Sequence, residues 1–281
     1  MPPRRLRLDA ELVRRSLARS REHACELIAA GRVTVQGAVA TKPATQITTD
    51  VAVVVRDNPD DPGYASRGGH KLAGALEDFG ELSLQGRRIL DAGASTGGFT
   101  DVSLRAGAAT VVAVDVGYGQ LIWSLQTDPR VQVHDRTNVR ELTLELIGGP
   151  VDVVVGDLSF ISLELVLDAL ISVTRPDGDL VLMVKPQFEV GKDRLGKGGV
   201  VRDPEIRAEM VLKIAHAAVE RGWGARAVTT SSLPGPSGNV EFFLWLRRGA
   251  AVVSDPDLHD AVVTAARLST RTAPADETVE P

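Results

Sequence analysis

Three charged residues stand at the ends of apolar runs, where a sheet interior would reject them, and a fourth lies in a short glycine-containing segment. Lys185 closes "DLVLMVK", Asp157 closes "VDVVVGD", Glu241 opens the apolar part of "NVEFFLWL", and Lys71 lies in "SRGGHKL". A single strand-end charge often only meets solvent. If the strands are neighbours, however, the side chains share one crevice, because the carboxyl ends of parallel strands meet at one edge of a sheet. Such a set could deprotonate or orient a hydroxyl group.

A glycine-rich turn, "DAGASTGGFT" (91–100), follows the first apolar run of the same region. Gly93 permits a sharp turn, and Gly97 and Gly98 let a helix begin close to a ligand. The NAD fingerprint G-x-G-x-x-G is broken here, because Ala-Ser replaces the middle glycine, which lets the backbone approach a pyrophosphate. S-adenosylmethionine has no pyrophosphate, so the turn favours this cofactor over NAD. A glycine-rich turn without any ligand is the alternative.

Carboxylates complete the predicted cofactor site. Asp115 ends the next apolar run, where it can accept hydrogen bonds from two ribose hydroxyls. Asp91, at the first strand end, suits a cationic or amino-bearing ligand. Arg136 and Asn138 follow the third run and could lie near an adenine. The predicted cofactor-binding residues are Asp91, Gly93, Ser95, Thr96, Gly97, Gly98, Phe99, Asp115, Asn138 and Asp157.

The elements that must position these residues follow from the apolar runs. Five runs rich in Val, Ile and Leu alternate with stretches long enough for helices, at 87–93, 110–117, 131–135, 151–157 and 179–186. Near-continuous apolar runs are typical of parallel strands covered on both faces. Two further runs, 225–231 and 240–248, predict a terminal antiparallel pair. The expected fold is α/β, with a Rossmann-like seven-stranded sheet.

The N-terminal residues predict a separate small α+β domain. Its expected elements are helices at 9–20 and 20–31, a hairpin over 32–40 and a strand at 50–56. Asp9 and Ser20 are expected N-caps, and Gly31 is expected just after the second helix. Gln36 and Gly37 are expected to form the hairpin turn.

Composition shifts predict the domain boundaries. Residues 59–68 are rich in Pro, Gly and Asp, which predicts a linker. The expected order is a small domain at 1–58, the linker at 59–68, the α/β domain at 69–268 and a disordered polar tail at 269–281.

Charge is distributed unevenly along the chain. The net charge is −5, whereas residues 1–56 hold ten Lys and Arg against five Asp and Glu. A basic domain on an acidic protein indicates binding to a polyanion such as RNA. The candidate RNA-binding residues are Arg4, Arg5, Arg7, Arg19, Arg21, Lys42, Arg67, Arg136, Phe160, Lys192, Arg194 and Lys197.

The segment "GKDRLGKG" (191–198) fits the G-x-x-x-x-G-K pattern of a phosphate-binding loop. Gly198 stands where that loop needs Ser or Thr for Mg²⁺, and no immediate helix follows, which argues against nucleotide hydrolysis. The segment is instead expected to be a mobile basic loop. Its phosphate-contacting residues would be Lys192, Arg194 and Lys197, together with Arg202 beyond it.

Composition also excludes several protein classes. A single cysteine, Cys25, argues against a disulfide framework and a cysteine-rich zinc site. The five histidines show no metal-ligand spacing, so no metal is expected. No apolar stretch approaches the roughly 18 residues of a membrane span, and no signal-peptide pattern follows the basic N-terminus. The chain is expected to be cytoplasmic and to have no membrane contact.

Taken together, these motifs resemble a known family. The region 69–268 resembles the FtsJ/RrmJ-type ribose 2′-O-methyltransferases, which are S-adenosylmethionine-dependent and have a Lys-Asp-Lys-Glu catalytic set. The segment "RLDAELVRRSLARSREHACELIAAGRVTVQGAVATKP" resembles the S4 RNA-binding domain, although the S4 hairpin usually has Asn-Gly where Gln36-Gly37 stands. An S4 domain followed by FtsJ, with "SRGGHKL" and "DAGASTGGFTD", is similar to the TlyA (haemolysin A) family over about residues 4–268.

The resemblance implies transfer of a methyl group from S-adenosylmethionine to the 2′-hydroxyl of cytidines in 16S and 23S ribosomal RNA. The implied catalytic residues are Lys71, Asp157, Lys185 and Glu241, with Lys185 as the base. A purely orienting role for Lys185 stays open. Phe160 could stack on an RNA base drawn out of its helix, or it could be a core residue.

Two other functions compete with this hypothesis. The older family name suggests a membrane-lytic toxin, which leakage of liposomes treated with pure protein would reveal. The absence of a spanning segment argues against it. An RNA-binding assembly factor with an inactive catalytic domain is the second alternative, and the complete charged set argues against that one.

Overall fold

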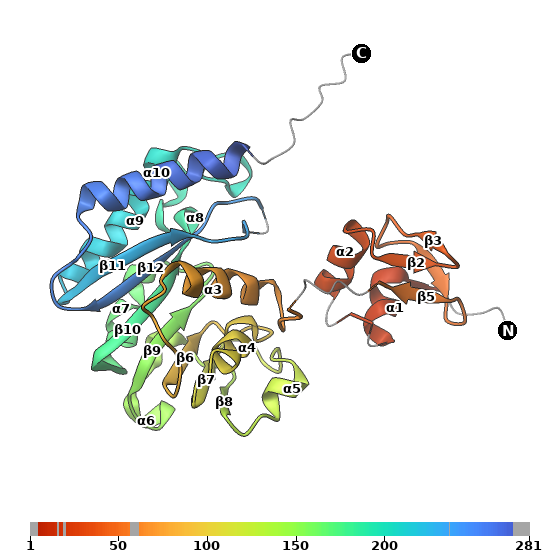
Figure 1. Ribbon diagram of the computed structural model, residues 1–281, viewed down its shortest axis with the longest axis horizontal. Coiled ribbons are helices and arrows are strands. Elements are labelled where there is room, and N and C mark those ends of the chain that lie inside the picture. The colour runs from red at the N-terminus through yellow and green to blue at the C-terminus, as the bar shows by residue number, and fades with distance from the viewer. Residues whose placement is uncertain (1–4, 16, 19–20, 57–61, 236, 272–281) are drawn as a thin grey trace, which may run out of the picture. The chain divides into compact units, whose positions relative to one another are not determined.

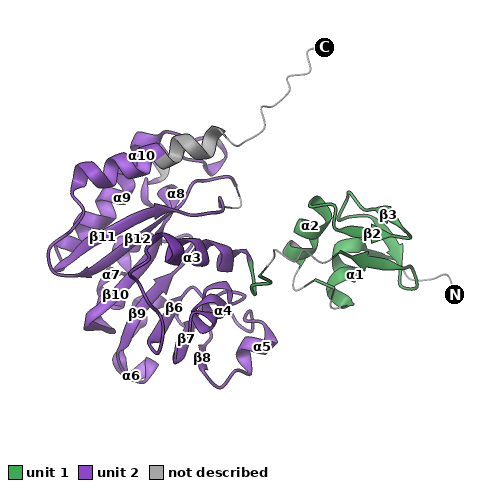
Figure 2. Ribbon diagram, in the orientation of Figure 1, with its two compact units in different colours: residues 1–66 green, residues 67–281 purple. Residues whose placement is uncertain are grey.

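The chain forms two compact units, residues 1–66 and 67–281 (Figure 2). The computed structural model describes residues 5–15, 17–18, 21–56, 62–235 and 237–271 (Figure 1). Among these residues, no helix is long and apolar enough to cross a membrane.

The first unit is a small α+β domain. Its helices are α1 (Leu8–Arg14) and α2 (Arg21–Ala29), and its strands are β1 (Arg5–Arg7), β2 (Val33–Val35), β3 (Ala38–Val39), β4 (Gln46–Thr48) and β5 (Val53–Val55). Strands β3, β2 and β5 form one antiparallel sheet, and β1 pairs with β4. Leu8, Leu12, Ile28 and Val33 are buried in its core. The sequence predicted the hairpin, β5 and both helices, but the first helix ends at Arg14 and not at residue 20 as expected. It missed β1 and β4, which are only three residues long.

Glycine-dependent turns of this unit lie where the sequence places them. Gly31 has a φ of 66° and donates from its N–H to the carbonyl of Ile28, while Arg32 donates to Leu27. This pair of bonds is the Schellman arrangement that ends many helices. Gln36 and Gly37 both have positive φ, as a two-residue type I′ hairpin turn requires.

The N-cap prediction for Asp9 is wrong. Arg7 occupies the N-cap position of α1, and Asp9 lies inside the first turn, almost completely buried. The carboxylate of Asp9 accepts hydrogen bonds from the guanidinium groups of Arg7 and Arg21. Charge pairing therefore holds Asp9 inside the helix, and the cap pattern in the sequence could not show this. The other expected N-cap, Ser20, lies outside the described residues.

The second unit is built on a seven-stranded sheet in the order β11-β12-β10-β9-β6-β7-β8. The strands are β6 (Arg88–Ala92), β7 (Thr110–Val114), β8 (Val131–His134), β9 (Val151–Gly156), β10 (Thr174–Val184), β11 (Trp223–Thr230) and β12 (Phe242–Arg248). Strand β12 runs antiparallel to the other six strands of this sheet. Every predicted strand is present, and β10 begins five residues earlier than expected.

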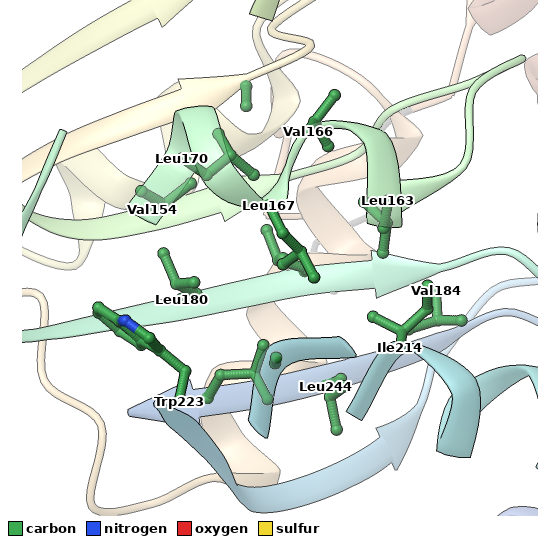
Figure 3. Packing of buried hydrophobic residues seen from close by; sticks show 14 of the residues in the cluster. Val154, Leu163, Val166, Leu167, Leu170, Leu180, Val184, Ile214, Trp223 and Leu244 are labelled. Carbon is green, nitrogen blue, oxygen red and sulfur yellow. The ribbon is translucent and has the colours of Figure 1, made fainter. Parts of the chain in front are cut away.

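The helices of the second unit are α3 (Arg67–Asp78), α4 (Gly98–Arg105), α5 (Trp123–Gln126), α6 (Leu144–Ile147), α7 (Leu167–Ser172), α8 (Pro186–Glu189), α9 (Pro204–Val219) and α10 (Asp255–Arg271). Helix α3 precedes the first strand of this unit, and the other helices come after or between the strands. Short 3-10 turns are η1 (Val139–Glu141), η2 (Leu163–Leu165), η3 (Lys192–Arg194) and η4 (Lys197–Gly199). Figure 3 shows Leu167 of α7 and Ile214 of α9 packed with Leu244 of β12 in the main core.

Two helix ends differ from the expected domain boundaries. Helix α3 begins at Arg67, inside the segment expected as linker, because burial of Leu72 and Ala75 outweighs the poor helix propensity of Gly68 and Gly69. Helix α10 continues to Arg271, past the expected domain end at 268. Residues 272–281 of the expected tail lie outside the described residues.

Candidate active site

Lys71 and Glu241 form a buried ion pair. Lys71 lies on α3 and Glu241 immediately precedes β12, and the Nζ–Oε2 distance is 2.6 Å, with side-chain exposures of 8% and 1%. The other carboxylate oxygen, Oε1, accepts a hydrogen bond from Nε2 of Gln187 at 3.1 Å. Gly235 approaches this oxygen so closely that a Cβ there would lie 2.6 Å from it. The Glu241 carboxylate is therefore fixed on several sides.

Lys185 and Asp157 form a second, more open ion pair. Lys185 directly follows β10 and Asp157 directly follows β9, and the Nζ–Oδ1 distance is 2.5 Å. Lys185 also donates to Oγ of Ser159 at 2.8 Å. Its side chain is 8% exposed, whereas that of Asp157 is 23% exposed. An incoming substrate would therefore meet this pair rather than the enclosed pair of Lys71 and Glu241.

Strand register explains why the four charges converge. Strands β9 and β10 are parallel neighbours, so their carboxyl ends carry Asp157 and Lys185 side by side. Strand β12 runs antiparallel to β10, with Val184 opposite Phe242. Glu241, one residue before Phe242, thus lies at the same sheet edge as Lys185. The structure places Asp157, Lys185 and Glu241 at one sheet edge, as the apolar runs indicated, and α3 brings Lys71 to Glu241.

A cavity of about 510 Å³ adjoins Asp157 at this sheet edge. Six of the predicted residues line it: Gly93, Ser95, Asp115, Asn138, Asp157 and Phe160. The remaining lining residues were not predicted and are Val116, Gln120, Val139, Leu158, Ser159, Ile161 and Val166. The sequence "DLSFI" after β9 contained the signal for Ser159, because a residue two positions beyond Asp157 must share its loop.

The glycine-rich turn forms one wall of the cavity. Gly93 has a φ of 88°, and a Cβ there would lie 2.9 Å from the backbone carbonyl oxygen of Asp157. Only glycine therefore lets the turn after β6 approach the loop after β9 so closely. Gly97 is the N-cap of α4, with a φ of 101°. A Cβ on Gly97 would collide with Leu125, so this glycine is also required by packing.

Several predicted cofactor residues are not among the lining residues. They are Asp91, Thr96, Gly97, Gly98 and Phe99. Phe99 is 3% exposed and its ring packs against that of Phe243, with 5.8 Å between centroids. Phe99 is thus a core residue and does not line the cavity. The sequence could not show which way its ring points.

Asp115 and Asn138 hold backbone groups around the cavity. The Asp115 carboxylate accepts from the N–H groups of Ser95, at 2.8 Å, and Gly117, at 2.7 Å. The Asn138 side chain accepts from the N–H of Arg140 and caps η1. These bonds fix the two loops that face each other across the cavity mouth.

Asp91 is a buried carboxylate with one free oxygen. Its Oδ2 accepts from the Thr100 hydroxyl at 2.6 Å, whereas its buried Oδ1 has no hydrogen-bond partner among the described residues. Burial raises the pKa of Asp91 from its ordinary value of 3.8 to about 7. A donor or a cation at the free oxygen would be favoured, because such a group compensates the burial of the charge.

The raised pKa of Asp91 predicts a pH dependence of stability. Between about pH 4 and about pH 7, the folded chain holds a proton that the unfolded chain has released. The free energy of unfolding should therefore fall as the pH rises through this window. Asp91→Asn should remove this loss of stability. The difference in unfolding temperature between the variant and the wild type should therefore change steadily as the pH rises toward 7. Exposed Asp177→Asn is the control, and a wild-type-like pH profile for Asp91→Asn would contradict the assignment.

Phe160 is a surface residue, so its interpretation as a core phenylalanine is wrong. Its side chain is 91% exposed, its φ is 65°, and its ring lies 5.1 Å from that of Phe188, between centroids. The positive φ turns the chain sharply and directs the ring outward. The exposed ring of Phe160, backed by the half-buried ring of Phe188, is a platform on which a base could stack.

The predicted RNA-binding residues differ in their surroundings. Arg5 and Lys42 are exposed. Arg7 and Arg21 instead pair with buried Asp9, and Arg7 holds the pKa of that carboxyl well below its usual range. These two arginines therefore help to fold the first unit. Arg4 and Arg19, and the side chains of Lys192 and Lys197, lie outside the described part of the chain.

In the second unit, most of the described candidates also have partners. Arg194 pairs with Glu209 through two hydrogen bonds of 2.6 Å. Leu195 packs against the small apolar cluster of Val190, Val201 and Met210, so the segment expected to be a mobile basic loop is anchored. The remaining two candidates are Arg136, which stacks over the Tyr118 ring at 4.3 Å, and Arg67, which donates to the carbonyl of Pro234.

No group of three or more His, Cys, Asp or Glu side chains that could hold a metal ion occurs within the described ranges.

Comparison with known proteins identifies the family. Residues 64–248 match the FtsJ-like methyltransferase family, and residues 6–53 match the S4 domain. The 16S/23S rRNA (cytidine-2′-O)-methyltransferase TlyA of Mycobacterium tuberculosis is 59% identical over 92% of this chain and 96% of that protein. Hemolysin A of Brachyspira hyodysenteriae is 34% identical over 84% of this chain and 98% of that protein.

A solved structure from Streptococcus thermophilus, which carries a hemolysin name, agrees with these matches. It has a TM-score of 0.76 and 34% identity, and the match covers 96% of this chain and 98% of that one. The chain belongs to the TlyA family, in which an S4 domain precedes an FtsJ-like methyltransferase domain.

Proposed function

We propose that this protein methylates the 2′-hydroxyl of cytidine riboses in 16S and 23S ribosomal RNA, with S-adenosylmethionine as the methyl donor. The observation that carries the proposal is the pairing of Lys185 with Asp157 beside the cavity, with Lys71 and Glu241 at the same sheet edge. A ribose hydroxyl is a poor nucleophile and needs a positioned group to take its proton as it attacks. The relative from Mycobacterium tuberculosis has the same activity in its name.

The residues around the cavity fit S-adenosylmethionine. The glycine turn at Gly93 leaves room for a ligand, and Asp115 stands where ribose hydroxyls can donate to it. Asp91 does not line the cavity, but it has a buried oxygen without a hydrogen-bond partner among the described residues. When bound there, S-adenosylmethionine supplies an activated methyl group. Asn138 and Ser95 would line the same ligand from opposite loops.

The chain's own residues then act on the RNA. Lys185, as the neutral amine, would contact the 2′-oxygen and take its proton as that oxygen bonds to the methyl carbon and the carbon–sulfur bond of the donor breaks, while Asp157 holds the lysine side chain beside the cavity. The pair of Lys71 and Glu241 would keep the neighbouring strand end and α3 in place. Phe160 would stack on the target base after it leaves its helix, because a buried nucleotide must be exposed before it is modified.

The S4 domain would supply RNA affinity through its basic residues. Of these, Arg5 and Lys42 are exposed, and phosphate contacts of this kind position a protein without reading sequence.

Asp115→Ala should weaken S-adenosylmethionine binding by about 1–3 kcal/mol, the cost of leaving buried hydroxyls without partners. Calorimetry of the purified protein measures this directly. The matched control is Asp135→Ala, which removes a carboxylate that follows β8 and accepts from the N–H of Gly119 at 2.9 Å, outside the cavity lining. Unchanged affinity in Asp115→Ala would remove this residue from the cofactor site.

The proposed activity is tested by mapping ribose methylation in ribosomal RNA. Subunits from cells lacking this gene are incubated with the pure protein and labelled S-adenosylmethionine. We expect 2′-O-methylcytidine to form in both 16S and 23S RNA. Label on a nucleobase, on another nucleoside or on no RNA would refute the proposal.

A further inference from the structure

The amine of Lys185 is contacted from two sides. On one side stands the carboxylate of Asp157, at 2.5 Å, and on the other the hydroxyl of Ser159, which accepts a hydrogen bond of 2.8 Å. The ring of Phe188 lies 5.9 Å from the same nitrogen. Lys185 and Asp157 are close because they follow the neighbouring strands β10 and β9. Ser159 lies two residues farther along, in the loop after β9.

Ser159 itself is held in a defined place. It lines the cavity beside Asp157, and the next residue, Phe160, has the positive φ that turns the loop. Farther along the loop, the buried carboxylate of Glu189 accepts from the hydroxyl of Ser162 and from the N–H of Leu163 at 2.8 Å. The loop is therefore pinned at both ends, and the Ser159 hydroxyl cannot drift from the lysine.

We propose that Ser159 is a positioning residue that aims the amine of Lys185 at the ribose 2′-oxygen. A single contact to Asp157 would let the amine rotate about the axis that joins the two groups. A second contact removes this freedom. Besides its bond to Cε, the tetrahedral nitrogen then has one position facing Asp157, one facing Ser159 and a single fixed position left for the substrate. The inference rests on the proposed function, because it assigns Ser159 a part in the same reaction.

The chemical nature of the serine suits this role. A hydroxyl accepts a hydrogen bond from an ammonium group without adding a second negative charge beside Lys185. A carboxylate in its place would hold the lysine proton more firmly and oppose its use as a base. Ser159 is exposed on its outer side, so a threonine can keep the hydroxyl and place its methyl group in solvent.

Turnover measurements test the proposal with the full chain and unmethylated subunits. Ser159→Ala should lower kcat by about ten- to a hundredfold, the effect of losing a hydrogen bond to a charged group. The KM for subunits and the affinity for S-adenosylmethionine should stay within about twofold, because Ser159 positions a reacting group rather than binding either ligand. Ser159→Thr should restore most of kcat. Exposed Ser172→Ala on α7 is the matched control.

A second measurement does not depend on activity. Acetic anhydride at limiting concentration, followed by mass spectrometry, reports the reactivity of each lysine amine. In Ser159→Ala, Lys185 should react about three- to tenfold faster, because its hydrogen bond to the serine hydroxyl is gone while the ion pair with Asp157 remains. Lys71, held by Glu241, is the internal reference and should not change.

These outcomes separate the two proposals. If the wild-type protein methylates no RNA, the proposed function fails while the labelling rates still decide whether Ser159 holds Lys185. If the wild type is active and Ser159→Ala keeps wild-type kcat, or if Lys185 labels equally fast in both proteins, the positioning role is overturned. A loss in Ser159→Ala that Ser159→Thr does not restore would also overturn it.

Discussion

Lys185→Ala is expected to abolish methyl transfer while leaving S-adenosylmethionine affinity within a few-fold of the wild type. The lysine follows the end of β10 and pairs with Asp157, which lines the cavity, so its loss removes the group that handles the ribose proton. Positioned acids and bases contribute about 10²–10⁴-fold to rate, and kcat should fall by that factor. Single-turnover methylation of ribosomal subunits measures the chemical step directly.

The control for this variant is another lysine-to-alanine change in the same unit. Lys213 lies on α9 and pairs with Glu164 at 3.2 Å, away from the cavity lining. Lys213→Ala should keep normal turnover. Thermal unfolding of both variants shows whether the fold is intact, since removing Lys185 leaves the Asp157 charge without its partner. Near-normal turnover in Lys185→Ala would mean that the charged set is not catalytic.

The strands of the second unit were predictable because parallel strands buried on both faces need unbroken apolar runs. Lys185 and Asp157 stood out in the sequence for the same reason, since a charge can follow such a run only where the strand leaves the sheet. The choice of partners was not predictable. Lys71 pairs with Glu241 across 170 residues of chain, and the sequence does not show that α3, which carries Lys71, lies next to the start of β12.

Side-chain direction was the other feature that the sequence could not supply. Phe99 and Phe160 both follow strand ends, yet the first is buried against Phe243 and the second is exposed beside Phe188. A positive φ at Phe160 separates the two cases, and a non-glycine residue gives no sequence signal for it. From the sequence, Arg7 and Arg21 were expected to be surface charges that contact RNA. Their pairing with Asp9 was not predictable, because Asp9 is buried only when its helix packs in the folded domain.

Deleting residues 1–56 is expected to spare S-adenosylmethionine binding and to weaken RNA binding sharply. The predicted cofactor residues all lie in the second unit, which has its own core. The deleted part carries the excess of Lys and Arg, so the remaining chain is more acidic and repels a polyanion. Calorimetry with the cofactor and a binding titration with ribosomal subunits measure the two effects separately.

The salt dependence of RNA binding tests more sharply whether residues 1–56 contact phosphates. Each phosphate contact that is lost should reduce the slope of log K against log salt by about 0.7–0.9, because fewer counterions are released. Arg5→Glu and Lys42→Glu should act in the same direction by smaller steps, since both side chains are exposed. Arg7→Glu is unsuitable, because it would break the pair with buried Asp9 and disturb folding.

A charge reversal of the same size in the second unit is the matched control. Arg175 lies near the start of β10, at the sheet edge opposite the cavity, where it pairs with Asp152. Arg175→Glu changes the net charge as much as Lys42→Glu does, so a general effect of net charge would lower both slopes equally. A specific phosphate contact would lower only that of Lys42→Glu. Equal affinities and slopes for full-length and truncated protein would instead mean that the catalytic unit finds its RNA alone, with the basic side chains of the first unit serving only its fold.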